Sequence, residues 1–193
     1  MWPVFYKDNV IVGNEKSPVA ICTLWSKKED FSNFSRDKFS VIGNLYTNCG
    51  INYLIKNILA NPRIKYIILC GKDLMKTGDV LINLLRNGLD EHYKIIGAAA
   101  YLDKTIPNDK IEILRKNVEI IDLRDEKNVK EKIEEILEKL PNDVDPFMDS
   151  LVVKEEEGGV ESLTSDDNVF RFEGKIAEVW LRILDIMLKF GEV

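Results

Sequence analysis

The stretch from residue 47 to residue 88 constrains the fold more than any other part of the sequence. Apolar residues recur at helical spacing from Ile51 to Leu59, and a proline ends that helix. A continuous apolar run follows from Ile64 to Leu69, as in strands buried on both faces. A polar loop from Gly71 to Gly78 then leads into a second helix, which Gly88 closes. This order indicates a parallel α/β sheet with the loop at the carboxyl end of a strand, where such sheets bind ligands.

Strands and helices also alternate on both sides of this stretch. The expected strands span residues 19–25, 39–45, 94–99 and 118–123, and the expected helices span residues 109–116 and 128–140. Residues 1–140 are therefore predicted to form a Rossmann-like, three-layer α/β domain with a mostly parallel sheet. After Pro141 the rhythm changes, and we expect a C-terminal annex in residues 141–193 that packs on the same domain. Its predicted parts are strands at Pro146–Glu155 and Val169–Phe172, which form a hairpin, and a helix at Lys175–Lys189.

The composition excludes several classes of protein. The net charge of −6 and the lack of a basic cluster with interleaved aromatic residues disfavour nucleic-acid binding. Three cysteines without C-x-x-C spacing disfavour a disulfide framework and a zinc site, and reduced thiols suit a cytoplasmic protein. No apolar run approaches the ~20 residues that a membrane span needs. We therefore expect a cytoplasmic protein without a membrane span.

The carboxyl ends of the expected strands define a candidate site for a small-molecule ligand. At the start of the second helix, Thr77-Gly78 would present free N–H groups to an anion, and Lys72 and Lys76 would add positive charge. An ordinary capped loop with solvated lysines stays open as the alternative, and the P-loop pattern does not occur. The predicted ligand-binding residues are Thr47, Asn48, Gly50, Gly71, Lys72, Asp73, Lys76, Thr77, Gly78, Gly97, Ala98 and Tyr101.

Cysteines are the candidate nucleophiles. Cys49 stands at a helix start, where a thiol pKa can fall, and Cys70 ends the central strand. The alternative role, a small buried apolar residue, is favoured for Cys22 and Cys70. His92 is the one histidine of the sequence and is expected at the opposite edge of the sheet. A catalytic triad and a histidine-rich metal centre are therefore disfavoured, and no metal ligand is predicted.

Short motifs in a fixed order carry a family resemblance. They are Trp2-Pro3-Val4, Val12-Gly13, Ser17-Pro18-Val19-Ala20, Thr23-Leu24, Gly50-Ile51, Asn57-Ile58, Asn61-Pro62-Arg63-Ile64, Leu69-Cys70-Gly71, Asn87-Gly88 and Ile95-Ile96-Gly97-Ala98. In order and spacing they resemble the A-subunit of tetrahydromethanopterin S-methyltransferase over residues 2–140. The run Leu69-Cys70-Gly71-Lys72-Asp73 and the ending Phe190-Gly191 are also similar to thymidylate synthase-related proteins of methanogenic archaea.

The resemblance to the methyltransferase A-subunit implies a Rossmann-like protein of methanogen one-carbon metabolism. That family carries a corrinoid, which shuttles a methyl group from the pterin carrier toward coenzyme M, and a histidine in the loop after the central strand holds the cobalt. Here the loop from Gly71 to Gly78 has no histidine, and a polar-striped helix at Lys175–Lys189 replaces the terminal membrane helix of the family. The resemblance therefore implies a soluble relative that keeps the cleft without the histidine anchor.

Three functions remain open at this point. The first is a protein of one-carbon metabolism that binds a corrinoid or tetrahydromethanopterin at the strand ends. The second is a thymidylate synthase-like methyltransferase that acts on a pyrimidine nucleotide, with Cys49 or Cys70 as nucleophile and Lys72, Lys76 or Arg124 at the phosphate. The third is a non-catalytic accessory or assembly protein, whose C-terminal helix binds a protein partner or forms a homodimer. The sequence does not decide whether the protein is an enzyme.

Overall fold

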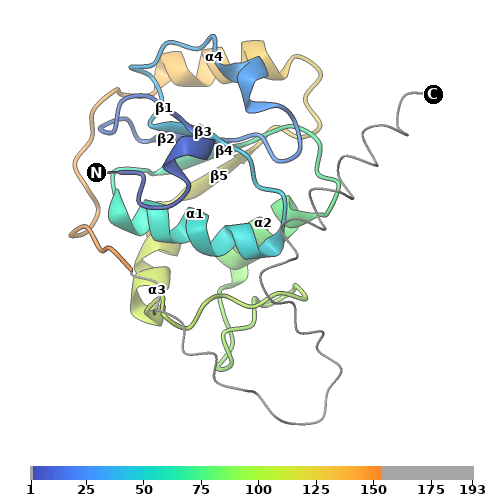
Figure 1. Ribbon diagram of the computed structural model, residues 1–193, viewed down its shortest axis with the longest axis vertical. Helices are drawn as coiled ribbons and strands as arrows, with labels where there is room; N and C mark the ends of the chain where they lie inside the picture. Colours follow the sequence, from blue (N-terminus) through green and yellow to red (C-terminus); the bar gives the residue numbers. More distant parts are fainter. Residues whose placement is uncertain (1, 154–193) are drawn as a thin grey trace. The chain divides into compact units, whose positions relative to one another are not determined.

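A mostly parallel sheet of five strands forms the centre of residues 2–153, the part of the chain that the computed structural model describes (Figure 1). The strand order is β1-β3-β2-β4-β5. Strands β2 to β5 run parallel, and β1 pairs with β3 in the antiparallel sense. The strands are β1 (Ile11–Val12), β2 (Val19–Cys22), β3 (Val41–Gly43), β4 (Tyr66–Leu69) and β5 (Glu119–Asp122). The α/β class and the mostly parallel sheet are thus confirmed.

Helices cover both faces of this sheet (Figure 1). Three lie on one face, α1 (Asn48–Ala60), α2 (Thr77–Asn87) and α3 (Asn108–Asn117), and α4 (Val129–Lys139) lies on the other with the 3-10 turn η2 (Lys28–Phe31). A further 3-10 turn, η1 (Lys7–Asn9), precedes β1. Side chains of β4 alternate between the two cores: Ile67 and Leu69 pack with α1 and α2, and Ile68 packs with α4. This alternation explains the continuous apolar run in the sequence, because both faces are buried.

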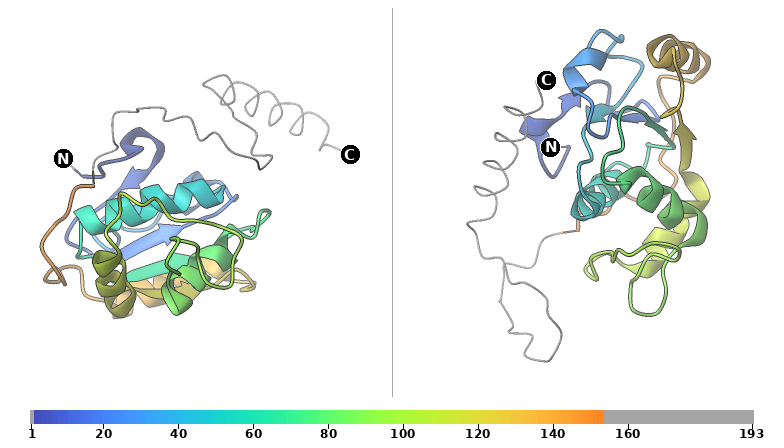
Figure 2. Two further views of the ribbon diagram at one scale, coloured as in Figure 1. Left: turned by 90° about the horizontal axis from the view of Figure 1, so that it is seen from below. Right: turned by 90° about the vertical axis from the view of Figure 1, so that its right-hand side faces the viewer.

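The expected strand at residues 94–99 is wrong. Residues 88–107 form a loop, which two isolated antiparallel bridges hold at Leu89–Ile95 and Lys94–Tyr101. Gly97 has a φ of 87° and reverses the chain, and Ile96 is 46% exposed. The apolar run does not form a strand, because the backbone turns within it and only Ile95 of residues 94–99 is deeply buried. The loop extends away from the sheet beyond α1 and α2 (Figures 1 and 2).

Residues 141–153 contain no strand, so the strand expected from Pro146 is wrong over its described part. They run irregularly past the end of α1, where the Phe147 N–H donates to the carbonyl of Pro62 (3.0 Å) and the Leu151 N–H donates to that of Leu59 (2.8 Å). Val153 is buried against the same core. The other predicted parts of the annex, the second strand and the terminal helix, lie outside the described residues. Within residues 2–153 no helix is long and apolar enough to cross a membrane.

Candidate ligand-binding site

The loops after β2, β3 and β4 meet at one edge of the sheet, as the sequence predicts. The amide of Asn44, just after β3, donates to Thr23 Oγ1 (3.0 Å) and to the carbonyls of Leu24 (2.9 Å) and Ser26 (2.7 Å). The loop after β4 is held to the same segment, because the Lys72 N–H donates to Ser26 Oγ at 3.1 Å. Backbone and side-chain hydrogen bonds therefore fix the three loops relative to one another. Sequence reasoning missed Asn44, because nothing near it marks its long-range partners.

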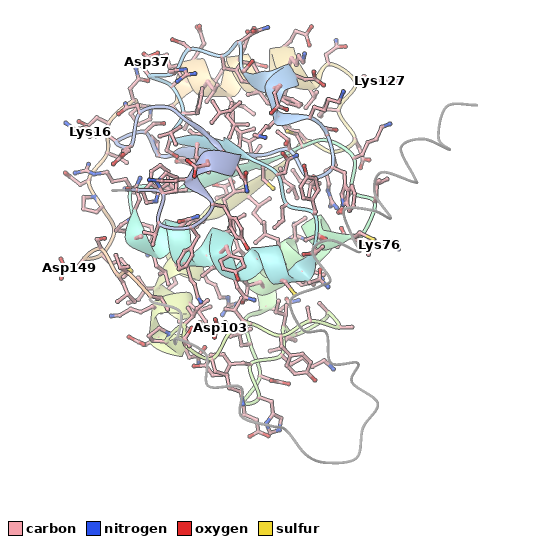
Figure 3. The ribbon with its side chains drawn as sticks, viewed as in Figure 1. Lys16, Asp37, Lys76, Asp103, Lys127 and Asp149 are labelled. Atoms are coloured by element: carbon pink, nitrogen blue, oxygen red, sulfur yellow. The ribbon has the colours of Figure 1, made fainter. Side chains whose placement is uncertain are left out.

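Gly71 makes a sharp exit from β4. Its φ is 83°, and a Cβ there would meet the carbonyl oxygen of Thr23 and approach Ser26 Oγ to 2.7 Å. Only glycine suits this backbone conformation and this close approach. The loop then displays Leu74 and Met75, which are 65% and 57% exposed, before Lys76 in a left-handed conformation precedes α2. Lys76 projects at the outside of the molecule (Figure 3).

A carboxylate of the chain itself occupies the start of α2. Asp73 Oδ2 accepts the Gly78 N–H at 3.0 Å and a hydrogen bond from Arg124 Nη1 at 2.7 Å, and the Asp73 side chain is only 10% exposed. A carboxylate at this position is favourable because the helix N-terminus carries partial positive charge. Thr77 Oγ1 donates instead to the carbonyl of Tyr46 (3.3 Å). The N–H groups at the start of α2, which the sequence predicts to bind an external anion, thus partly have hydrogen-bond partners within the protein.

Arg124 joins three acidic side chains at this edge. Beyond Asp73, its Nη1 lies 2.8 Å from Asp79 Oδ1, and its Nε and Nη2 lie 2.9 and 2.7 Å from the two oxygens of Asp122. The hydrogen bonds from Arg124 hold the pKa of Asp122 below its usual value. A guanidinium engaged in this way positions the loop after β5 against α2. One hypothesis from the sequence is that Arg124 binds the phosphate of a nucleotide. In the structure, carboxylates of the chain itself occupy the hydrogen-bonding groups of Arg124 instead.

A cavity of about 550 Å³ opens beside these loops, between the N-terminal segment, β3 and α1. Three predicted residues line it: Thr47, Gly50 and the candidate nucleophile Cys49. Aromatic side chains supply much of its wall, namely Trp2, Phe5, Tyr6, Tyr46 and Tyr53. A pocket of this size with apolar walls and a few polar groups is typical of small-molecule sites.

Asn57 of α1 holds the N-terminal wall of this cavity in place. Its Oδ1 accepts the N–H groups of Val4 (2.9 Å) and Phe5 (3.0 Å), and its Nδ2 donates to the carbonyl of Phe5 (3.1 Å). The indole N–H of Trp2 donates to the Asn57 carbonyl at 2.8 Å. These hydrogen bonds join residues more than fifty positions apart in the sequence, and no local sequence pattern predicts them.

The three cysteines differ in how far their thiols are buried. Cys22 and Cys70 are buried, and desolvation raises the pKa of each thiol to about 12. A thiolate nucleophile at Cys70 is therefore disfavoured, and the expected apolar role of Cys22 and Cys70 agrees with their burial. Cys49 is exposed in the first turn of α1, at the cavity. Of the two candidate nucleophiles, only Cys49 is accessible.

Comparison with known proteins identifies the family. Residues 1–163 match the family model of the tetrahydromethanopterin S-methyltransferase A-subunit, MtrA. The chain belongs to this family. It is 34% identical to A-subunit 1 of Methanothermobacter thermautotrophicus, over 97% of this chain and 81% of that protein. It is 35% identical to A-subunit 2 of Methanobrevibacter ruminantium, over 81% of this chain and 83% of that protein, and 29% identical to the A-subunit of Methanocaldococcus jannaschii, over 86% and 74%.

Three predicted ligand-binding residues of this MtrA family member lie away from the strand ends. Gly97, Ala98 and Tyr101 belong to the 88–107 loop, and a Cβ on Gly97 would be closest to Asn83 and Asn87 of α2. The sequence places them at the site only through the expected strand at 94–99, which does not form. A binding role for them stays a prediction without support from the sheet edge.

The residues of this family member do not fit a corrinoid held by histidine. His92, the one histidine of the chain, lies in the 88–107 loop with its side chain 77% exposed and 3.5 Å from Glu91. The loop after β4 offers no imidazole, and its one carboxylate, Asp73, is bonded to Arg124 and Gly78. Within residues 2–153, no cluster of three or more histidine, cysteine or acidic residues could hold a metal ion.

Proposed function

We propose that this protein binds a pterin of methanogen one-carbon metabolism in the cavity between the N-terminal segment and α1. The aromatic cavity of about 550 Å³ is the observation that carries the proposal. Family membership supplies the ligand class, because the relatives are named for a methyltransferase that acts on tetrahydromethanopterin. A flat heterocycle stacks favourably between aromatic rings, and Trp2, Phe5 and Tyr53 line the wall.

The walls of the cavity are arranged before any ligand arrives. Phe5 and Tyr53 lie with ring centroids 5.4 Å apart, and Tyr6 packs edge-on against Tyr53 at 4.8 Å. Asn57 fixes the backbone that carries Phe5. Because the wall is already ordered, less conformational entropy is lost when a ligand binds, and the affinity is correspondingly higher. A corrinoid bound here would lack a histidine ligand from this chain, and for that reason we favour the pterin.

Calorimetric titration tests this proposal. We expect tetrahydromethanopterin to bind, and Cys49→Phe, which places a ring in the cavity at an exposed helical position, to weaken binding by about tenfold or more. Met75→Phe is the matched control, since Met75 is also exposed but does not line the cavity. Cobalamin titrated in parallel reports on the alternative ligand. No heat from tetrahydromethanopterin at high micromolar concentration, or equal binding by both variants, would refute the proposal.

A second candidate function rests on Cys49 itself. An accessible thiol at a helix N-terminus beside a cavity could add to a pyrimidine ring, as in a thymidylate synthase-like methyltransferase. This candidate predicts methylation of a pyrimidine nucleotide that Cys49→Ser abolishes and Cys70→Ser leaves in place, because Cys70 is buried in the core. Activity that persists in Cys49→Ser would exclude it.

A protein partner is the third candidate. The relatives are named as subunits of a larger enzyme, which supports an accessory or assembly role for this homologue. The C-terminal helix to which the sequence assigns that role lies outside the described residues. Co-purification from a methanogen, with the full chain as bait, tests whether other components of the methyltransferase bind it. Recovery of the chain alone would count against this role.

A further inference from the structure

Strand β5 lies at the open edge of the sheet, where it pairs with β4 on one side only (Figure 2). The N–H groups of Glu119 and Leu123 donate to the carbonyls of Lys65 and Leu69, each at 2.8 Å, so the odd-numbered residues face β4. In a parallel ladder the alternate residues then direct their backbone groups to the other side. The backbone groups of Ile120 and Asp122 thus face away from the sheet, and among residues 2–153 no hydrogen-bond partner covers them.

A groove of about 550 Å³ lies along this edge, between β5 and the helices α2 and α3. Its floor is apolar, with Ile82 and Leu85 from α2 and Ile120 from β5. Its rim is basic, with Lys65, Arg86, Arg115 and Lys116. An open strand edge beside a lined groove is the arrangement through which proteins bind extended peptides as added strands.

The charges of the groove are not balanced from within. Arg115 is engaged by Glu112 at 2.6 Å and by the carbonyls that end α2, and Asp122 is engaged by Arg124. Lys65, Arg86 and Lys116 form no ion pair within 4 Å among the described side chains. The charge of Arg86 contributes to the lowered pKa of Asp122, and Glu119 is the other acidic residue that lines the groove, so four basic residues face two acidic ones. This basic rim stands out on a chain with a net charge of −6. It attracts an acidic partner.

We propose that β5 and this groove bind an extended acidic peptide segment of a partner protein, which adds to the sheet as a further strand. Ile120 and Asp122 supply backbone hydrogen bonds to the added segment. Because side chains alternate along a strand, every second residue of the segment faces the groove, where carboxylates meet Arg86 and Lys116 and apolar groups meet Ile82 and Leu85.

A second copy of this chain suits the edge less well. A two-fold pairing of β5 with itself would bring two identical basic rims together, and like charges at an interface are unfavourable. The surface is also separate from the proposed pterin cavity. The cavity is lined by β3 and α1, whereas the groove is lined by β5, α2 and α3. The peptide site therefore does not depend on the proposed function.

Fluorescence anisotropy tests the site with a labelled peptide of the repeat Val-Ser-Glu-Ser, in which every second residue is valine and glutamate in turn. We expect binding that weakens with added salt. The double variant Arg86→Glu, Lys116→Glu should weaken it by about tenfold or more, and the matched control Lys104→Glu, Lys127→Glu should leave it unchanged. Lys104 and Lys127 are exposed and lie outside the groove, and Lys127 is seen on the loop before α4 (Figure 3).

Two further measurements separate strand addition from simple charge attraction. A peptide of the same sequence with every backbone nitrogen methylated keeps the glutamates but offers no N–H donor to β5, and it should not bind. Ile120→Pro removes an edge donor without breaking the ladder to β4, and if it remains folded by circular dichroism it should not bind. Binding of the N-methylated peptide, an equal loss in the control variant, or wild-type dimers in sedimentation that Ile120→Pro abolishes would each overturn the proposal.

Discussion

Gly71 is a residue at which the fold tolerates a side chain poorly. Its φ is 83°, and an added Cβ would meet the backbone of Thr23 as well as the side chain of Ser26. We expect Gly71→Ala to lower the free energy of unfolding by about 3 kcal/mol, from backbone strain together with the clash. Gly50→Ala is the control: its Cβ would lie 2.9 Å from Leu45 Cδ1, the end of a flexible side chain, so a change below about 1 kcal/mol is expected. Urea unfolding measures both, and equal losses would contradict the assignment.

Lys56 is the most deeply buried charge of the described residues. Its side chain is 2% exposed, its Nζ lies 2.7 Å from Asp103 Oδ2, and it stands over the rings of Phe5 (5.6 Å) and Tyr53 (5.9 Å). It thereby joins α1 to the N-terminal wall and to the 88–107 loop, where Asp103 lies below α1 (Figure 3). Burial raises the pKa of Asp103, and the hydrogen bonds from Lys56 and Thr105 outweigh that effect, so the net pKa is lowered.

This ion pair predicts a pH-dependent stability. We expect Lys56→Met to lose about 2 kcal/mol at pH 7, because it leaves the carboxylate without its cation. A carboxyl with a lowered folded pKa contributes stability above its unfolded pKa of about 3.9 and loses it as the pH falls through the folded pKa. The difference from wild type should therefore shrink below about pH 4. Urea unfolding at pH 7 and pH 3 checks this, with the exposed pair variant Lys110→Met as control. A difference that stays constant with pH would contradict it.

At the scale of elements, Arg124 holds the loop after β5 to the start of α2. Arg124→Ala leaves the carboxylate of Asp73, which is 10% exposed, without its cation, and we expect a loss of about 3 kcal/mol at pH 7. The pKa of Asp122 should rise, since its hydrogen bonds from Arg124 are gone. Asp79→Asn is the control, because the Asp79 side chain is 51% exposed and its pair should contribute below about 1 kcal/mol. Urea unfolding and carboxyl NMR titration measure both effects; similar losses in the two variants would show that Arg124 acts elsewhere.

Elements with a complete local signal were predictable from the sequence. Helix α2 has helical spacing and ends at Gly88, whose φ of 78° and N–H bond to the Leu84 carbonyl (3.0 Å) match a C-cap. Strand β4 has an apolar run because both of its faces are buried. The 94–99 segment has a similar run but turns at Gly97. Its conformation depends on contacts to α2, such as the hydrogen bond from Asn87 Nδ2 to the Ile96 carbonyl, and local spacing does not encode them.

At the scale of the whole molecule, residues 141–153 test where the domain ends. The sequence predicts that the segment after Leu140 is an annex packed on the same domain, and Phe147, Leu151 and Val153 pack on the core of residues 2–140. We expect a chain cut after Leu140 to be less stable by about 3 kcal/mol or more than one cut after Val153, from lost apolar burial and backbone hydrogen bonds. Thermal unfolding of the two truncations measures this. Equal melting temperatures would instead support the boundary at residue 140.

The sequence by itself determined the α/β class, the helix and strand at the centre of the chain, and the family, because these depend on local periodicity and on ordered motifs. It also brought Thr47, Gly71 and Thr77 to one edge, since parallel strands end together. Only the tertiary structure decided which groups are already engaged. Asp73 and Arg124 satisfy each other across 51 residues of sequence, and Asn57 builds the cavity wall from segments 52 to 55 residues away. Packing of the whole chain decides which residues become partners. It therefore also decides which hydrogen-bond donors stay free for a ligand and which are bonded within the protein.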